Sequence, residues 1–405
     1  MSLDVPSATG AEGAAKDDTQ RDKVPNANAR YHVAFYIPSM GVGGAQKVTA
    51  TIANGLVEAG HRVDIVVSYG GGEFTDALDD SVRVVELGTP RLPFVGVLAS
   101  VPALRRYLNE ERPDVLIGAM MHANVVSVLA DAVSGTETTV ALTEHNTVGV
   151  RHGRKEALTT RIAARLYGSA DSVIAVSEGV ADSIATELGT DPESIAVLYN
   201  PIEVDDIATA ATQPIAEQTP AREWLSDPSL QVLFTVGRLE AAKDLPTLLR
   251  AFARVHDERP ETRLVVAGTG SKRDELESLA SSLGIRERVC FPGYVENAYA
   301  YMGRADAFVL SSRHEGLPTV LLEALACGLP IVSTDCPSGP HEILDGGELG
   351  PLVPVGDDEA LSEAIARVLD DPVEDTRLRS RAEDFSVQAV TTAYESFVAS
   401  LVDDR

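Results

Sequence analysis

Short apolar runs alternate with amphipathic helical patterns along most of the chain, and this alternation limits the folds that it can form. One set of runs begins at 31–39 and includes 61–68 and 113–120. A second set begins at 231–237 and continues to 329–334. Apolar strands separated by helices are typical of parallel sheets that carry helices on both faces. The pattern therefore predicts two α/β units of similar size.

The limits of these units follow from where the alternation weakens. Residues 1–30 lack periodicity and are rich in small and polar residues, so we expect a disordered tail. The first unit is predicted over 31–200, a linker over 201–230 and the second unit over 231–385. The amphipathic pattern of 386–405 predicts a C-terminal helix, which could cross back to the first unit. Two doubly wound units would face each other across a central cleft, where a ligand is expected.

The charge of the chain argues against one class of partner. Its 61 acidic and 34 basic residues give a formal net charge of −27, so we do not expect nucleic acid to bind, because its phosphates would be repelled. Most of the basic residues are arginine, and an acidic, lysine-poor composition resembles that of proteins from salt-loving organisms. Charge of this kind bears on solubility and does not decide the fold.

Cysteine spacing and the first residues bear on the compartment. Cys290, Cys327 and Cys336 show no C-x-x-C spacing, which argues against a disulfide framework or a zinc site and favours a reducing compartment. The first residues lack the basic region and apolar run of a secretory signal. A cytoplasmic location is therefore expected.

Two basic residues follow the first predicted strand of the second unit, in the sequence TVGRLEAAKDL. Arg238 and Lys243 would lie in the loop at the carboxyl end of this strand, where doubly wound sheets bind ligands. Two cations there suit a phosphate or a diphosphate. Asp244 can cap the helix that begins near Pro246. The alternative is an ordinary solvated loop.

Two glutamates occur in the sequence SSRHEGLPTVLLEAL, which follows another predicted strand. Glu315 would lie in the loop, and Glu323 would fall one turn inside the next helix, which Pro318 and Thr319 suit as a first turn. The free amides of this helix start favour an anion. A carboxylate cannot help to hold a phosphate, so these glutamates suit hydroxyl groups. Two surface carboxylates are the alternative.

Three glycines follow the first predicted strand, in the sequence PSMGVGGAQKV, and would let a ligand approach the backbone closely. The motif is not a P-loop, because Gln46 replaces the required glycine and Val48 replaces serine or threonine. It is also a poor dinucleotide fingerprint, since the second strand ends in Ser68 and Tyr69, where an acid should bind ribose. An NAD-dependent dehydrogenase is therefore disfavoured.

Together these motifs resemble the family-4 retaining glycosyltransferases of GT-B fold. The resemblance runs from about Tyr31 to the end of the chain and is densest over 231–355. It rests on the segments GVGGAQ, LYNP, VGRLEAAKD, VVAGTGSKRDELE and GYVEN, and on the two glutamates. The segment TDCPSGPHEIL (334–344) is similar to the branch that often uses UDP-linked hexosamines or hexoses. The resemblance implies two Rossmann-like domains that face a central cleft.

The resemblance also implies roles for single residues. Arg238 and Lys243 would hold the donor diphosphate. Glu315 would contact the transferred sugar, and Glu323 would bind the ribose hydroxyls. Gly43 and Gly44 would approach the donor from the first unit. Val295 would contact the base through backbone atoms, and the amides of Thr319 and Val320 would contact phosphate.

Two histidines complete the candidate set. His122, in GAMMHAN, matches a histidine of the family that contacts the sugar, and His145, in TEHN, is a second candidate. A structural histidine is the alternative at both positions. The resemblance implies a nucleotide sugar as substrate, with no cofactor and no metal ion.

A local excess of positive charge points to the acceptor. Segment 151–166 has a formal charge of +4, from five basic residues and one acidic residue, within an acidic chain. Its residues Arg151, Arg154 and Lys155 form a candidate patch for an anionic membrane face or a lipid-phosphate-linked acceptor, and the apolar stretch 92–108 could dock beside it. An ordinary helix with solvated arginines is the alternative.

The expected function is transfer of a hexose or hexosamine from a UDP-sugar, favoured over GDP-mannose, to a lipid-linked or cell-surface glycan. Such an acceptor would place the protein on the inner face of the membrane as a peripheral protein. A sugar-nucleotide epimerase of the same architecture and a non-catalytic nucleotide-sugar-binding protein are the two alternatives.

Overall fold

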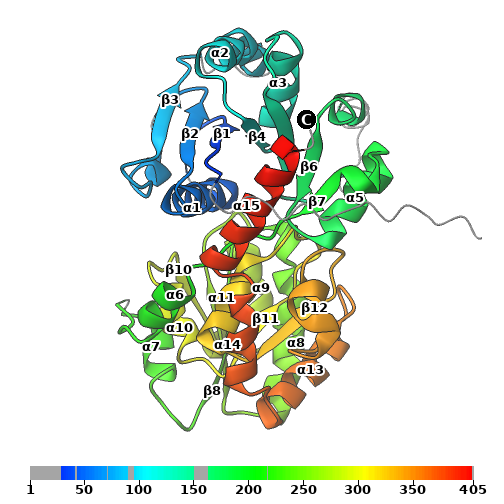
Figure 1. Ribbon diagram of the computed structural model, residues 1–405. Coiled ribbons are helices and arrows are strands. Elements are labelled where there is room, and N and C mark those ends of the chain that lie inside the picture. The colour runs from blue at the N-terminus through cyan, green and yellow to red at the C-terminus, as the bar shows by residue number, and fades with distance from the viewer. Residues whose placement is uncertain are drawn as a thin grey trace, which may run out of the picture.

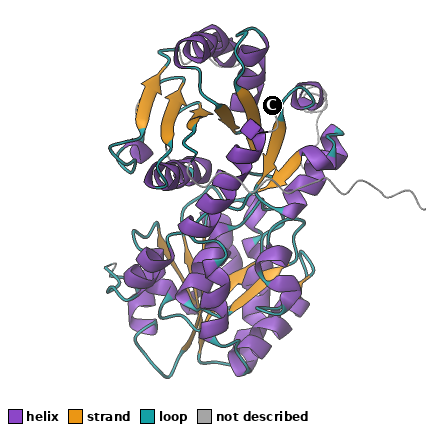
Figure 2. Ribbon diagram, in the orientation of Figure 1, coloured by secondary structure: helices purple, strands orange, loops and turns teal. Residues whose placement is uncertain are grey.

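The computed structural model describes residues 29–41, 43–70, 72–89, 95–149, 163–216 and 218–403. They form two α/β domains, each a parallel sheet covered by helices (Figures 1 and 2). The expected tail at 1–30 falls almost entirely outside the described residues, and so does the patch of Arg151, Arg154 and Lys155.

The first domain contains a seven-stranded parallel sheet. In spatial order its strands are β3 (Arg83–Glu86), β2 (Arg62–Val67), β1 (His32–Ile37), β4 (Val115–Ala119), β5 (Thr139–Glu144), β6 (Ser172–Ala175) and β7 (Ile195–Val197). The helices of this domain include α1 (Gly44–Glu58), α2 (Val95–Glu111), α3 (Met121–Ala132) and α5 (Glu178–Leu188). The central strands are buried along nearly their whole length, because helices cover both faces of the sheet.

The second domain contains a six-stranded parallel sheet. Its strands in spatial order are β10 (Val289–Gly293), β9 (Thr262–Ala267), β8 (Gln231–Val236), β11 (Ala307–Leu310), β12 (Ile331–Thr334) and β13 (Leu352–Val353). Its helices include α8 (Leu245–Glu258), α9 (Arg273–Ser282), α10 (Ala298–Met302), α11 (Thr319–Cys327), α12 (Pro340–Ile343), α13 (Asp358–Asp370) and α14 (Asp375–Glu383). This is the doubly wound order, which reverses between β8 and β11, and in the first domain between β1 and β4.

The stretch between the two sheets is helical in part. It carries α6 (Val204–Ala211) and α7 (Pro220–Trp224), and α6 packs against α10 and α11. The stretch expected to be a linker therefore adds a layer to the second domain.

The last helix, α15 (Val387–Asp403), runs from the second domain back to the first, as Figure 1 shows. Its buried face contributes Val390, Tyr394 and Val398 to the core of the first domain. A Cβ added to Gly55 of α1 would lie 2.2 Å from the Thr391 hydroxyl, so the two helices are in direct contact. The C-terminal helix therefore belongs to the first domain by its packing.

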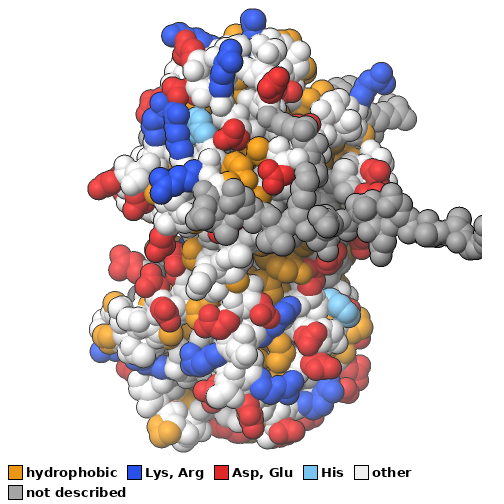
Figure 3. Space-filling view, viewed as in Figure 1, with side chains coloured by type: hydrophobic (Ala, Val, Ile, Leu, Met, Phe, Trp, Pro, Cys, Tyr) orange, Lys and Arg blue, Asp and Glu red, His pale blue; other side chains and the backbone are white. Residues whose placement is uncertain are grey.

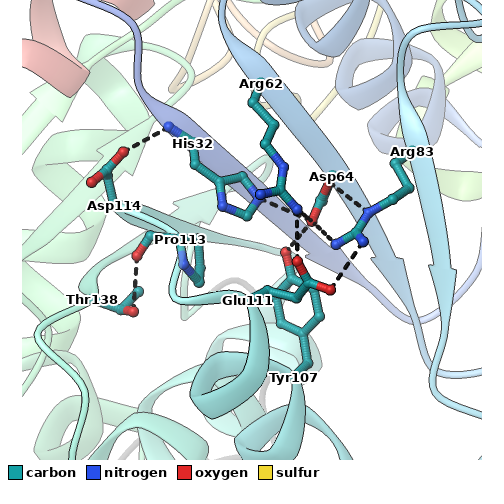
Figure 4. Close-up of polar contacts among 9 residues, drawn as sticks. All are labelled: His32, Arg62, Asp64, Arg83, Tyr107, Glu111, Pro113, Asp114 and Thr138. Atoms are coloured by element: carbon teal, nitrogen blue, oxygen red, sulfur yellow. Dashed lines mark hydrogen bonds and ion pairs between the residues drawn. The ribbon is translucent and has the colours of Figure 1, made fainter.

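A buried polar network ties the edge strand β3 to the rest of the first sheet (Figure 4). The Asp64 carboxylate on β2 accepts hydrogen bonds from Arg83 Nε and Nη2 at 3.0 and 2.5 Å, and from the Tyr107 hydroxyl at 2.6 Å. His32 Nε2 lies 2.9 Å from the same carboxylate. Burial raises the pKa of Asp64, but these hydrogen bonds outweigh it and hold the pKa well below its usual range. One carboxylate thus joins three strands and α2.

On the face drawn in Figure 3, Asp and Glu side chains are scattered across both domains. Within the described part of the chain, none of the helices has both the length and the apolar character that crossing a bilayer requires. The three cysteines are buried and unpaired, which confirms the prediction of no disulfide framework.

Candidate active site

The point where the strand order of the second sheet reverses brings two loops together. Lys243 ends a short 3-10 helix after β8, and Glu315 lies in the loop after β11. The Ser311 hydroxyl donates to the Lys243 carbonyl oxygen at 2.8 Å, and the Arg313 amide donates to the carbonyl oxygen of Ala242 at 2.8 Å. These backbone ties hold the two loops side by side at the carboxyl ends of the strands.

A cation and an acid from these loops are in contact. Lys243 Nζ lies 2.5 Å from Glu315 Oε1, and the Ser312 hydroxyl donates to the same oxygen at 2.6 Å. The Lys243 and Glu315 side chains are 21% and 14% exposed, so a ligand can reach both. Arg238 is exposed and, together with Lys243 and Ser312, lines a small pocket at the end of β8.

Asp244 is the N-cap residue of α8, but its carboxylate does not bond a backbone amide of that helix. It accepts a hydrogen bond from the Thr247 hydroxyl at 2.9 Å and pairs with Arg313 Nε at 3.0 Å. The expectation of a side-chain cap is therefore wrong, because the carboxylate links α8 to the loop that carries Glu315.

The first turn of helix α11 directly follows the loop that carries Glu315. It begins at Thr319, its N-cap residue is Pro318, and no side chain caps it. The amides of Thr319 and Val320 thus lie at a helix start that favours an anion. Glu323, one turn further, is 13% exposed. The two candidate glutamates therefore flank one helix N-terminus, as their spacing predicts.

Glu323 has partners on two other elements. The Tyr299 hydroxyl of α10 donates to Glu323 Oε1 at 3.2 Å, and Lys47 Nζ of α1 lies 3.8 Å from the same oxygen. Burial raises the pKa of Glu323, and Lys47 and Tyr299 oppose that rise. The first domain thus contributes a cation to the surroundings of Glu323. Sequence reasoning missed both partners, although Lys47 lies within the glycine motif that it singled out.

The remaining donor candidates also lie at strand ends. Gly43 is the N-cap residue of α1, and Gly44 is its exposed first residue, with open space where a Cβ would be. Val295 is buried two residues after β10, next to Tyr294, whose side chain is 74% exposed. All three candidates follow the carboxyl ends of β1 or β10.

The two candidate histidines differ in their surroundings. His122 is the exposed second residue of α3, and it follows Met120, whose φ of 82° marks the tight turn out of β4. His145 follows β5, and burial lowers its pKa to about 4 although Asn200 opposes the shift. Its ring is therefore neutral at physiological pH, whereas His122 is exposed to solvent.

A buried carboxyl group lies next to His145 and was not singled out by the sequence. The Asn124 amide and the Tyr167 hydroxyl both donate to Glu144 Oε1 at the end of β5. Burial raises the pKa of Glu144 to about 7, against the effect of these two hydrogen bonds. Asn124 belongs to α3, and Tyr167 ends the helical residues 163–167, so Glu144 joins the two elements that frame the expected acceptor side.

The Glu144→Gln variant is expected to change the pH dependence of stability. A carboxyl group whose pKa is raised on folding stabilises the fold fully below its unfolded pKa of about 4.3, and this stabilisation is lost as pH rises towards 7. Thermal midpoints of variant and wild type should therefore converge near pH 5 and differ near pH 8, with the variant more stable there. His145 titrates in the same range in both proteins, so the difference between the curves isolates Glu144. Parallel curves would show that Glu144 is ionised throughout.

Models of two protein families match the chain. The family "Glycosyltransferase Family 4" matches residues 42–206. The family "Glycosyl transferases group 1" matches residues 218–385. Each match therefore covers the greater part of one of the two domains.

Several characterised proteins are similar over most of the chain. One is the N-acetylgalactosamine-N,N'-diacetylbacillosaminyl-diphospho-undecaprenol 4-alpha-N-acetylgalactosaminyltransferase of Campylobacter jejuni, 26% identical over 84% of this chain and 90% of that protein. Another is the lipopolysaccharide core biosynthesis glycosyltransferase LpsE of Rhizobium meliloti, 28% identical over 88% of this chain and 96% of that protein. The crystal structure of Anabaena Alr3699/HepE in complex with UDP and glucose superposes with a TM-score of 0.76, at 21% identity, over 92% of this chain and 100% of that one.

Proposed function

Because the chain belongs to the family-4 glycosyltransferases of GT-B fold, we propose that it transfers a hexose or hexosamine from a nucleotide diphosphate sugar to a glycan, with retention at the anomeric carbon. A UDP-sugar is favoured over GDP-mannose as the donor. The observation that carries the proposal is the contact of Lys243 with Glu315 where the second sheet reverses its order. A cation for the diphosphate and an acceptor for sugar hydroxyls meet there.

In this proposal the donor lies across the carboxyl ends of β8 and β11. Arg238 and Lys243 face the diphosphate, together with the amides at the start of α11. Glu315 accepts hydrogen bonds from hydroxyls of the transferred sugar, and Glu323 accepts them from the ribose. Gly43 and Gly44 allow the first domain to approach the diphosphate from the opposite side.

The chemistry follows from where charge develops. The bond between C1 of the sugar and the diphosphate oxygen breaks, and its electron pair leaves with the diphosphate. The acceptor oxygen forms a new bond to C1 on the same face, and its proton passes to the departing diphosphate. Fixed cations next to the leaving oxygen stabilise this transition state more than the ground state. We assign Glu315 no covalent role and propose that no metal ion is needed.

The acceptor is proposed to be a lipid-linked or cell-surface glycan. Two similar proteins are named for a diphospho-undecaprenol-linked glycan and for the lipopolysaccharide core, which supports this class. The basic residues Arg151, Arg154 and Lys155 would contact the lipid phosphate, and His122 would lie on the acceptor side of the transferred sugar. This arrangement would hold the protein on the inner face of the membrane.

A donor screen tests this function. We expect one UDP-sugar to be consumed together with a polyprenyl-diphosphate-linked glycan in anionic vesicles, and the product to show the anomeric configuration of the donor in NMR spectra. EDTA should leave the rate unchanged. A new epimer of the donor formed without acceptor would instead identify an epimerase, and binding without turnover a non-catalytic protein. Replacement of Arg151, Arg154 and Lys155 by serine should weaken flotation of the protein with vesicles if those residues contact lipid.

A further inference from the structure

The segment 334–344, with the sequence TDCPSGPHEIL, contributes no side chain to the donor contacts proposed above. The structure places it where the first domain meets the loop that carries Glu315. Its contacts with that loop and with α5 of the first domain include those of Ser338, Gly339 and Glu342. Its position therefore points to a role other than donor recognition.

Three buried oxygen atoms from separate segments meet at this point. The Ser338 hydroxyl donates to the Gly316 carbonyl oxygen at 2.7 Å, and the Ser177 hydroxyl of the first domain lies 2.9 Å from the same oxygen. The two hydroxyl oxygens are 2.8 Å apart. Ser177 is 0% and Ser338 is 3% exposed. Two hydroxyl protons are thus shared among three oxygens of buried residues, and a buried polar group that loses its partner is costly.

Glycines allow the backbones to approach this closely. A Cβ on Gly316 would lie 2.0 Å from the carbonyl oxygen of His145, and one on Gly179 would lie 2.5 Å from that of Pro337. Both contacts are between the two domains. A side chain at either position would push the domains apart, so the two domains meet here through direct contacts between their backbones.

A carboxylate adds a further contact between the two domains. Glu342 accepts hydrogen bonds from the amides of Glu178 and Gly179, at 2.9 and 3.2 Å, and so caps the N-terminus of α5 from the other domain. Its negative charge is favourable at the positive end of that helix. The segment 334–344 is therefore fixed to the first domain at one end and to the Glu315 loop at the other.

We propose that Ser177 and Ser338 are positioning residues that hold Glu315 in a fixed position relative to the first domain. This inference rests on the proposed role of Glu315 in sugar binding. Gly316 follows Glu315 directly, so a restrained Gly316 carbonyl restrains the backbone from which the Glu315 side chain projects. Because Ser177 belongs to the first domain, the sugar-binding carboxylate keeps its place relative to the acceptor side as well as to the donor. A shift of about 1 Å in such a group can cost two orders of magnitude in rate.

The Ser338→Ala variant tests the inference, because Ser338 caps no helix. We expect kcat for sugar transfer to fall about tenfold while KM for the donor stays within about twofold, since the diphosphate contacts are untouched. Ser177→Ala should have a similar effect, although it also removes the Ser177 cap from the Val180 amide. The matched control is Ser172→Ala, which removes a buried hydroxyl that donates to the Ser194 carbonyl oxygen at 3.1 Å within the first domain, and should change neither constant.

Hydrogen exchange separates this inference from the proposed function. In Ser338→Ala, the amides of residues 313–320 should exchange faster than in the wild type, and those of the Ser172→Ala control should not. Unchanged kcat and unchanged exchange would overturn the positioning role. Equal losses in kcat and donor affinity would overturn it as well, because they indicate general destabilisation. If the wild type transfers no sugar, the proposed function fails. The exchange result alone then decides whether Ser177 and Ser338 restrain the loop that carries Glu315.

Discussion

The Lys243→Ala variant is expected to transfer sugar about 100-fold to 1000-fold more slowly than the wild type, the range found when one electrostatic donor to a developing anion is removed. Lys243 contacts Glu315 at 2.5 Å and ends the 3-10 helix that follows β8, where we propose that the departing diphosphate binds. The loss should appear mainly in kcat, because charge on the leaving oxygen grows towards the transition state. Steady-state rates with the donor found in the screen measure it.

A matched control separates this effect from a loss of positive charge in general. Arg254 lies on α8 of the same domain and pairs with Asp358 at 2.9 Å on an exposed surface. The Arg254→Ala variant should keep the wild-type rate within about twofold, since exposed ion pairs contribute little. The assignment of Lys243 to the diphosphate is refuted if its variant matches the Arg254 variant in rate and both remain folded.

The double variant Lys243→Ala with Glu315→Ala is informative about the contact itself. Residues that touch each other show non-additive effects, so the double variant should lose less activity than the product of the two single losses. Additive losses would mean that the two side chains act on separate parts of the donor.

The Asp64→Asn variant is expected to destabilise the first domain by about 2 kcal/mol. Removal of one partner from a fully buried ion pair costs about 3 to 5 kcal/mol, and the loss is smaller here because Arg83 is 43% exposed and can be hydrated. For a domain of this size the thermal midpoint should fall by about 4 to 8 °C. The Glu110→Gln variant, which breaks the exposed pair with Arg106, should leave the midpoint nearly unchanged.

Acid unfolding gives a second measure of the same carboxylate. Because folding lowers the pKa of Asp64, its stabilisation is complete above the unfolded pKa of about 3.9 and is lost as pH falls through the folded value. The wild type should therefore lose stability steeply below about pH 4, and Asp64→Asn should show a shallower decline. Equal slopes would mean that His32, Arg83 and Tyr107 do not favour the ionised form.

The central strands were predictable, and three of the four edge strands were not. The apolar runs at 31–39 and 231–237 correspond to β1 and β8, which helices cover on both faces. The edge strands β3, β7 and β13 are only two to four residues long and only partly buried, so their apolar residues are too few to indicate a strand. Strand β3 is held by the polar contacts of Arg83, which join residues far apart in the chain.

The candidate residues of the second domain lie where their motifs predict, because each motif follows a strand directly. The partners that come from other elements were missed. Lys47 of the first domain lies next to Glu323 of the second, and Ser177 contacts Gly316, which is 139 residues away in the sequence. Glu144 is a similar case, since its neighbours Asn124 and Tyr167 are about 20 residues away on either side.

The sequence alone therefore determined the alternation of strands and helices, the two-domain architecture and the loops that carry Arg238, Lys243 and Glu315. These features depend on local periodicity and on the fact that a loop after a parallel strand lies at one edge of the sheet. Only the tertiary structure decided that α15 joins the core of the first domain and that Ser177 and Ser338 meet at the Gly316 carbonyl oxygen. Such contacts depend on which surfaces the folded chain brings within a few ångströms, and no local pattern of residues encodes that distance.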